Sequence, residues 1–270
     1  MELLASILGR SMSYRLLAFL SILFIFSFLE LYLKRRDDPN PLGERWSRKL
    51  SNFLLLSVGA LFSLLFIRVA PMASSEFASA HEIGILNWLK LPFFAEVIVG
   101  VIFLDLIIYF QHRAFHRFNF LWRFHKVHHV DNLLDSTTAL RFHPIEILLS
   151  LFVKSLAILV LGVRGDVVLV FEFILSSMAI FNHANIQLPI FVEKYLKFFL
   201  VTPNFHVIHH HPEKEFHNSN FGFNLSFWDY IFKTSQSGLG IDFSNYKCGL
   251  EGEEENSLKG MLEIPFRKLD

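Results

Sequence analysis

Cysteine is nearly absent from this sequence: Cys248 is the single one among 270 residues. One cysteine excludes an intrachain disulfide, and it also excludes zinc or iron–sulfur sites built from several cysteines. Charge is scarce as well, because Asp, Glu, Lys and Arg make up only 19% of the chain and the formal net charge is zero. Without an excess of positive charge, the chain is not expected to bind nucleic acid.

Apolar residues are abundant: 53% of the chain is hydrophobic, 32 residues are Phe and the mean hydropathy is +0.41. This is the composition of a membrane protein. A helix needs about 20 apolar residues to cross a bilayer, so we expect an all-α integral membrane fold with four to five hydrophobic helices. The apolar segments are 14–33, 52–69, 93–110, 145–161 and 167–181. The first is long and precedes a basic loop, which favours a membrane helix over a removable signal.

Basic residues are concentrated between the first two apolar segments. Six of them lie there: Lys34, Arg35, Arg36, Arg45, Arg48 and Lys49. The loop between the second and third segments carries only Lys90. The positive-inside rule therefore places the first loop in the cytoplasm, the N-terminus outside and the end of the third helix inside. The last two segments form a hairpin that returns to the same side, and Lys154 and Glu172 leave open whether it spans fully.

Three parts are expected along the chain. Residues 1–92 would hold N-terminal transmembrane helices and loops, and residues 93–235 a catalytic domain. Residues 236–270 would be a C-terminal cytoplasmic tail. All histidine clusters fall at the inner ends of the helices, so they are expected in a helical cap on the cytoplasmic face.

Histidines form three clusters with helical spacing. The pattern F-H-x-x-H-H occurs at 124–129 and again at 205–210, and H-x-x-x-H occurs at 112–116. Positions i, i+3 and i+4 of a helix share one face, whereas chance would produce one H-x-x-H-H about 0.03 times in this length. The eight clustered residues are His112, His116, His125, His128, His129, His206, His209 and His210. With His143 and His183 nearby, they suit two metal ions, because one ion takes four to six ligands.

The identity of the metal follows from the number of imidazoles. Neutral imidazole binds iron, zinc and copper. A catalytic zinc site usually has three protein ligands and a carboxylate base nearby, so this set exceeds what one zinc ion needs. Redox-active iron acting with dioxygen accounts for the surplus better.

Three carboxylates are candidates for a catalytic role in which they orient a metal-bound histidine. Asp105 lies seven residues before His112, about two helix turns away on the same face. Glu146 follows His143, and Asp229 follows a tryptophan. Each also has a structural interpretation: Asp105 as a helix-packing acid, and Glu146 and Asp229 as helix caps.

These motifs together resemble the fatty acid hydroxylase/sterol desaturase superfamily. The resemblance covers roughly residues 95–235. Its motifs are D-x6-H-x-x-x-H at 105–116, W-R-F-H-K-V-H-H at 122–129, F-H-P at 142–144, N-H at 182–183, P-N-F-H-V-I-H-H at 203–210, N-F-G at 220–222 and F-W-D at 227–229. Some members have two histidines in the middle element where this chain has only His183. The run His209-His210-His211 is longer than the usual pair.

The resemblance implies an integral membrane enzyme of lipid metabolism with a histidine-bound di-iron centre. Carried over by position, the ligands are His112, His116, His125, His128, His129, His183, His206, His209 and His210, with His143 in or beside the ligand shell. Such enzymes use dioxygen and reducing equivalents to hydroxylate, desaturate or oxidise lipids.

The sequence thus predicts a membrane-bound oxygenase with two iron ions that hydroxylates or desaturates a lipid. The lipid would enter from the bilayer, and electrons would come from an external carrier such as cytochrome b5 or a ferredoxin, since no redox module is recognisable. A zinc-dependent membrane hydrolase is the alternative within enzymes. A metal transporter or sensor is less favoured, because the clusters lie past the helix ends instead of near the bilayer midplane.

Overall fold

The computed structural model describes residues 2–67, 70–236, 238 and 241–267, with the backbone alone for residues 2–14. All regular elements in this part of the chain are helices, and β pairing is limited to isolated bridges such as Lys34 with Ile186. The long helices are α1 (Glu2–Tyr32), α2 (Leu42–Leu64), α5 (Phe93–Arg117), α7 (Pro144–Leu161) and α8 (Gly165–His183). The expected all-α fold is confirmed.

Four of the five long helices are long and apolar enough to cross a membrane. They are α1, over its stretch Arg15–Tyr32, together with α5, α7 and α8. Helix α2 is not among them. It begins at Leu42, ten residues before the predicted segment, and so takes Arg45, Arg48 and Lys49 into its first turns. Residues 52–64 of the second predicted segment are therefore the apolar half of an amphipathic helix, and its last two positions, 68–69, lie outside the described residues.

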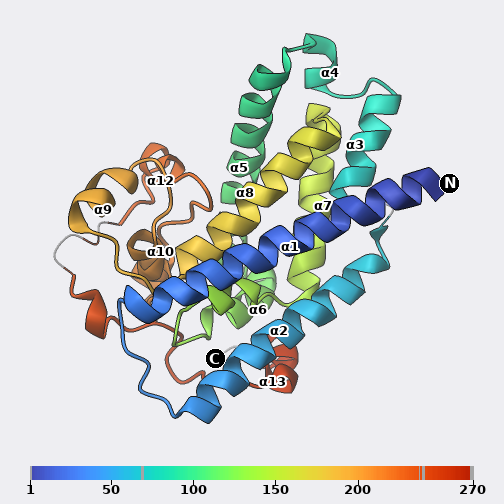
Figure 1. Ribbon diagram of the computed structural model, residues 1–270. Helices are drawn as coiled ribbons and strands as arrows, with labels where there is room; N and C mark the ends of the chain where they lie inside the picture. The colour runs from blue at the N-terminus through green and yellow to red at the C-terminus, as the bar shows by residue number, and fades with distance from the viewer. Residues whose placement is uncertain (1, 68–69, 237, 239–240, 268–270) are drawn as a thin grey trace.

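The shorter helices surround the two ends of this bundle. They are α3 (Pro71–Ala80), α4 (Ile85–Leu89), α6 (Asn119–His129), α9 (Ile190–Leu196), α10 (Pro203–His209), α11 (Lys214–His217), α12 (Phe227–Ile231) and α13 (Leu258–Glu263), with 3-10 turns η2 (Ser136–Leu140), η3 (Phe243–Asn245) and η4 (Ile264–Phe266). In Figure 1, α3 and α4 lie at one end of α5, α7 and α8, and α6 and α10 lie at the other.

Helices α7 and α8 form the predicted hairpin. Helix α7 ends at Gly162, whose φ of 72° is left-handed and suits glycine. The turn is held against the α3–α4 region, because Ser75 Oγ donates to the Val163 carbonyl at 2.6 Å. A Cβ on Gly84 would lie 2.1 Å from the Gly162 nitrogen, so this approach requires glycine.

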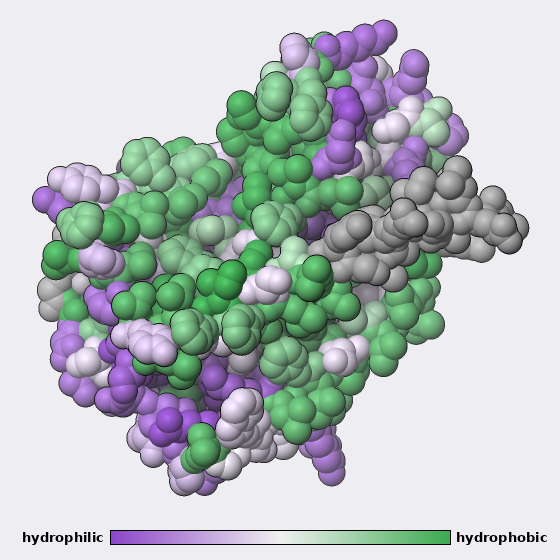
Figure 2. Space-filling view, viewed as in Figure 1, coloured by the Kyte–Doolittle hydropathy of each residue, from purple (hydrophilic) through white to green (hydrophobic). Residues whose placement is uncertain are grey.

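Apolar side chains both fill the bundle and cover it. Leu104, Ile158 and Phe171 are each 1% exposed in the core where α5, α7 and α8 meet. Outward-facing side chains are also large and apolar, for example Phe24 on α1 and Phe94 on α5. Figure 2 shows hydrophobic side chains over the long helices and hydrophilic ones gathered near the start of α2 and at the α3–α4 tip. An apolar surface of this extent between two polar ends matches a surrounding bilayer.

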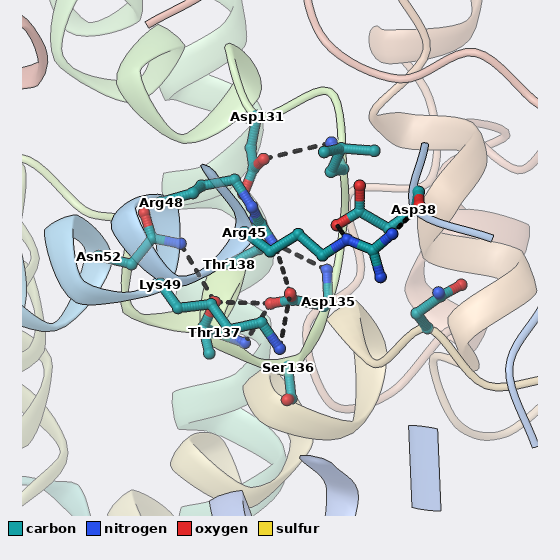
Figure 3. Close-up of polar contacts among 12 residues, drawn as sticks. Asp38, Arg45, Arg48, Lys49, Asn52, Asp131, Asp135, Ser136, Thr137 and Thr138 are labelled. Atoms are coloured by element: carbon teal, nitrogen blue, oxygen red, sulfur yellow. Dashed lines mark hydrogen bonds and ion pairs between the residues drawn. The ribbon is translucent and has the colours of Figure 1, made fainter. Parts of the chain in front are cut away.

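A buried ion-pair network joins α2 to the loop after α6 (Figure 3). Arg48 is 2% exposed; its Nη1 donates to Asp131 Oδ2 at 2.7 Å, and its Nη2 donates to Asp135. Burial alone would raise the pKa of Asp131, but the Arg48 and Arg141 guanidiniums outweigh it and lower that pKa to about 2. Asp135 also caps η2 by accepting from the Thr137 N–H. The network fixes α6, which carries three of the predicted ligands.

Residues 258–264, within the predicted C-terminal segment, pack against α2 and α6. Met261 and Ile264 are buried with Leu55 of α2 and with Val127 and Val130 at the end of α6. This packing adds a second, apolar support under α6, on the side away from the bundle core.

Candidate metal centre

Four helix ends deliver nine of the ten predicted histidines to one buried place. Helix α5 contributes two from its last turns, α6 contributes three, α8 contributes its final residue, and α10 with its C-cap contributes three. They form a five-histidine group of His112, His116, His125, His129 and His209 and a four-histidine group of His128, His183, His206 and His210. Within each group, the candidate ligand atoms all lie within 4.8 Å of one another.

The two H-x-x-H-H motifs contribute to the groups crosswise. On α6, the i and i+4 residues His125 and His129 join the five-histidine group, while His128 joins the other. On α10, His206 and His210 join the four-histidine group, while His209 joins the five. Each motif therefore spans both groups. Helix α5 adds two members to the first group, which brings it to five histidines. Helix α8 adds one member to the second group, which brings it to four.

Imidazole nitrogens approach one another at distances that suit shared metal ions. In the five-histidine group, His112 Nε2 lies 3.1 Å from His125 Nε2. In the four-histidine group, His183 Nε2 lies 2.9 Å from His128 Nε2 and 3.0 Å from His206 Nε2. Metal–nitrogen bonds of about 2.0–2.1 Å place neighbouring ligand atoms of one ion roughly 3 Å apart. The donor set therefore fits a metal in each group.

Four of the nine histidines have an Nδ1 bonded to an outer acceptor. The pairs are His112 with the Phe221 carbonyl at 2.9 Å, His125 with Glu146 Oε1 at 2.6 Å, His183 with the Ala179 carbonyl at 2.6 Å and His209 with the Ser219 carbonyl at 2.7 Å. An acceptor at Nδ1 places the proton there and leaves the Nε2 lone pair free for a metal. Three of these acceptors are backbone carbonyls, which carry no signal in the sequence.

Several buried imidazole nitrogens in the described part of the chain have no hydrogen-bond partner. They are both ring nitrogens of His116 and of His129, Nδ1 of His128, His206 and His210, and Nε2 of His209. A buried polar atom without a partner is costly. Burial, reinforced by the neighbouring imidazoles, also holds the pKa of His128, His129, His206, His209 and His210 well below its usual range. Neutral imidazole is the form that binds metal.

Of the three predicted carboxylates, Glu146 alone contacts an imidazole. It lies in the first turn of α7 and is 3% exposed, and its Oε1 accepts from His125. Its second oxygen, Oε2, is buried without a partner among the described residues. The carboxylate therefore orients one member of the five-histidine group.

Asp105 and Asp229 act on a loop instead of on an imidazole. Asp105 accepts from Trp228 Nε1 at 2.9 Å and from the N–H groups of Asn224 and Leu225 at 3.2 Å. Asp229 accepts from the Phe221 N–H at 2.8 Å. Burial raises the pKa of Asp229 to about 6, against the lowering effect of the hydrogen bonds that it accepts from the Thr234 hydroxyl and from the N–H groups of Gly222 and Phe221. Because the Phe221 carbonyl accepts from His112, both carboxylates position that histidine through the loop.

The structure does not bring His143 into either group. It is the N-cap of α7, where its Nδ1 accepts from the Ile145 N–H at 3.2 Å and its ring lies near Phe124. His211 also stays outside both groups, as does His81, which lies at the end of α3. His217 also lies outside both groups, but it is 6% exposed and stacks on Trp122 beside the five-histidine group. Trp122 lies three residues before His125, and this helical spacing was the signal in the sequence that its ring lies beside the histidines.

An apolar cavity of about 240 Å³ reaches the histidines from between α5, α7 and α8. Its apolar lining includes Ile108, Phe115, Leu151, Leu175 and Phe223. At its inner end it is lined by five of the nine histidines, namely His112, His125, His128, His183 and His206. Three of these belong to the four-histidine group. The cavity therefore connects the centre with the three helices that can cross a membrane.

Comparison with known proteins finds several enzymes that this chain resembles. The ornithine lipid hydroxylase OlsE of Rhizobium tropici is 28% identical over 177 residues, which cover 66% of this chain and 52% of that protein. The very-long-chain aldehyde decarbonylase GL1-1 of Oryza sativa subsp. indica is 26% identical over 183 residues, which cover 63% of this chain and 28% of that protein. The alkylglycerol monooxygenase of Homo sapiens is 28% identical over 138 residues, covering 49% and 29%.

The chain thus spans about half or less of the length of these relatives. No solved structure matches it. A family model described as fatty acid hydroxylase matches residues 97–234, just over half of the chain, and the match contains all nine grouped histidines. This integral membrane chain therefore belongs to the fatty acid hydroxylase family, within the fatty acid hydroxylase/sterol desaturase superfamily of lipid hydroxylases and monooxygenases.

Proposed function

We propose that this protein is a di-iron oxygenase that hydroxylates a lipid with dioxygen and electrons from an external carrier such as cytochrome b5 or a ferredoxin. The observation that carries the proposal is the crosswise division of nine buried histidines into groups of five and four. One ion takes four to six ligands, so nine imidazoles match two ions. Relatives that are named hydroxylase and monooxygenase support iron over zinc, because a metal that activates dioxygen must change its oxidation state and zinc does not.

The nine histidines would hold the two ions, and iron bound there would supply the activation of dioxygen for attack on a C–H bond. Glu146 fixes the tautomer of His125, and the Phe221, Ala179 and Ser219 carbonyls do the same for three other histidines. Asp105 and Asp229 hold the loop that supplies the Phe221 carbonyl. The task of these residues is to keep Nε2 lone pairs directed inward.

The apolar cavity would position the lipid. Its walls come from α5, α7 and α8, so a chain can enter from the bilayer without crossing water. Catalytic metal sites keep an open position, and the group with fewer histidines provides three of the five that line the cavity. We therefore infer that the target carbon approaches the four-histidine group. The named substrates of the relatives favour an acyl or alkyl chain, and their names favour hydroxylation over desaturation.

We also infer that the centre lies on the cytoplasmic face and that residues 93–235 form the catalytic domain, between membrane helices in 1–92 and a cytoplasmic segment in 236–270. The support is the basic segment at 34–49, which comprises the loop before α2 and the first turns of α2 and lies at the same end of the bundle as α6 and α10. A reporter placed in the 36–41 loop should be cytoplasmic, and one placed next to His81 should be external. The reverse result would contradict this orientation.

Metal analysis tests the centre itself. Protein purified in detergent and loaded anaerobically with Fe²⁺ should retain about two iron ions per chain, because each group completes one coordination sphere. A single bound zinc ion that iron cannot replace, together with lipid hydrolysis, would support the hydrolase alternative instead.

A further inference from the structure

A second cavity reaches the centre from the polar end of the molecule. It has a volume of about 490 Å³ and shares no lining residue with the apolar cavity. His116, Trp122 and His217 line it together with Arg113 and Arg117 at the end of α5. His116 is the one member of the two groups that is only partly buried. His116, whose two ring nitrogens are themselves buried, is therefore the member of the five-histidine group that lines this cavity.

Aromatic contacts connect this cavity to the centre. The Trp122 ring centroid lies 4.9 Å from that of His116 and 5.2 Å from that of His129. His217 stacks on Trp122 at 5.3 Å with an interplanar angle of 19°, and its ring centroid also lies 6.0 Å from that of His116 and 6.2 Å from that of His129. Trp122 and His217 thus form one aromatic cluster with two members of the five-histidine group. An electron that reaches Trp122 in the wall of this cavity is therefore one ring contact away from His116 and His129, two of the candidate metal ligands.

The rim of the cavity is positively charged. Arg113, Arg117 and Lys214 are exposed and line it, and none of the three forms an ion pair with another described residue. The nearby acids are few. Glu213 and Glu215 flank Lys214 in the chain but do not line the cavity, and Asp229 near Arg113 is fully buried. Such a rim attracts an acidic surface over a distance of about a Debye length, roughly 8–10 Å.

We propose that this cavity and its rim are the docking site of a soluble, acidic one-electron carrier protein, which delivers electrons to the five-histidine group through His116 and Trp122. This inference rests on the proposed function. Hydroxylation joins a C–H bond, O2, two electrons and two protons to give C–OH and water. Two reduced carriers are therefore oxidised in each turnover, and each must bind and leave quickly. Small, charge-steered contacts of this kind are typical of electron-transfer complexes.

A rival cationic cavity provides the matched control. It has a volume of about 790 Å³ and is lined by four cations, Lys34, Arg35, Arg36 and Lys247, and by two acids, Asp37 and Glu251, but by no member of either histidine group. Replacing two rim cations by glutamate in each cavity gives R117E/K214E and K34E/K247E, which change the protein charge equally. None of these four residues belongs to either histidine group or lines the apolar cavity.

The test measures two quantities for the full-length protein in nanodiscs: direct binding of cytochrome b5 or ferredoxin, and lipid hydroxylation as the concentration of the reduced carrier is varied. The carrier concentrations for half-saturated binding and for half-maximal rate should both rise about tenfold or more in R117E/K214E at low salt, and their dependence on salt should flatten. K34E/K247E should resemble the wild type. An unchanged R117E/K214E, or a larger effect in K34E/K247E, would overturn the docking site.

A single-turnover measurement separates docking from chemistry. Protein that has been reduced chemically beforehand and is then mixed with oxygenated buffer needs no carrier, so R117E/K214E should form as much product as the wild type. If pre-reduced R117E/K214E forms less product than the wild type, to the same degree as in the carrier-dependent assay, the rim supports the centre structurally, and this result would overturn the proposal. Absence of product from the pre-reduced wild type would instead contradict the proposed oxygenase function.

Discussion

His128 and His129 are neighbours in the sequence, but their imidazoles belong to different groups. Their ring planes are 84° apart, with centroids separated by 5.6 Å. His128 meets His183 and His210, whereas His129 faces His116 and His209. One turn of α6 therefore supports both halves of the centre, and the two halves cannot vary independently in position.

This relationship predicts distinct losses from two adjacent substitutions. His128→Ala should remove the ion from the four-histidine group, so that the iron content falls from about two to about one per chain. His129→Ala should instead weaken iron binding by the five-histidine group. Hydroxylation should be abolished in both variants. Iron analysis together with product formation measures the effect.

His143→Ala is the matched control, because His143 lies outside both groups. It should keep two iron ions and measurable activity, and His81→Ala should do the same. Full activity in His128→Ala, or loss of an iron ion in His143→Ala, would contradict the assignment of the groups.

Glu146→Gln should weaken iron binding by about 10–100-fold without abolishing it. The amide oxygen can still accept from His125 Nδ1, but it lacks the negative charge that strengthens the bond. Anaerobic iron titration measures the change. Glu96→Gln, a buried carboxylate in the first turn of α5, is the control and should leave iron affinity unaltered. Equal effects in the two variants would mean that Glu146 acts only through packing.

Arg48→Met should lower the free energy of unfolding by about 3–5 kcal/mol, because Asp131 is left buried without its main ion-pair partner. Arg45→Met, three residues earlier on the same helix and only half-buried in its ion pair with Asp38, should cost no more than about 1 kcal/mol. Denaturant unfolding in a fixed detergent measures both. A cost for Arg48→Met as small as that for Arg45→Met would show that the network does not anchor α6.

Leu151→Trp should reduce lipid turnover while the protein keeps both iron ions, because the larger side chain fills part of the apolar cavity. Val153→Trp, on the lipid-facing side of the same helix, should have little effect. Product formation over a range of lipid concentrations compares the two. Normal turnover in Leu151→Trp would place the substrate elsewhere.

Much of this arrangement was predictable from helical spacing. The apolar segments predicted the long helices, and i, i+3, i+4 spacing predicted which histidines share a face. The crosswise division was not predictable, because it depends on how α6 packs against α5, α8 and α10. The contacts of Asp105 and Asp229 could not be predicted from the sequence either, since their partners include backbone N–H groups of the 221–225 loop. His143 has the right residue type, but its position at the start of α7 directs it elsewhere.

The most direct test of the oxygenase assignment is isotope incorporation. Wild-type protein loaded with two iron ions should be supplied with ¹⁸O2, a reduced carrier and a lipid with an acyl or alkyl chain. The account predicts one ¹⁸O atom in the hydroxylated lipid for each two electrons consumed, and no product without iron. Oxygen derived from water in the product, without consumption of dioxygen, would contradict it and indicate hydrolysis.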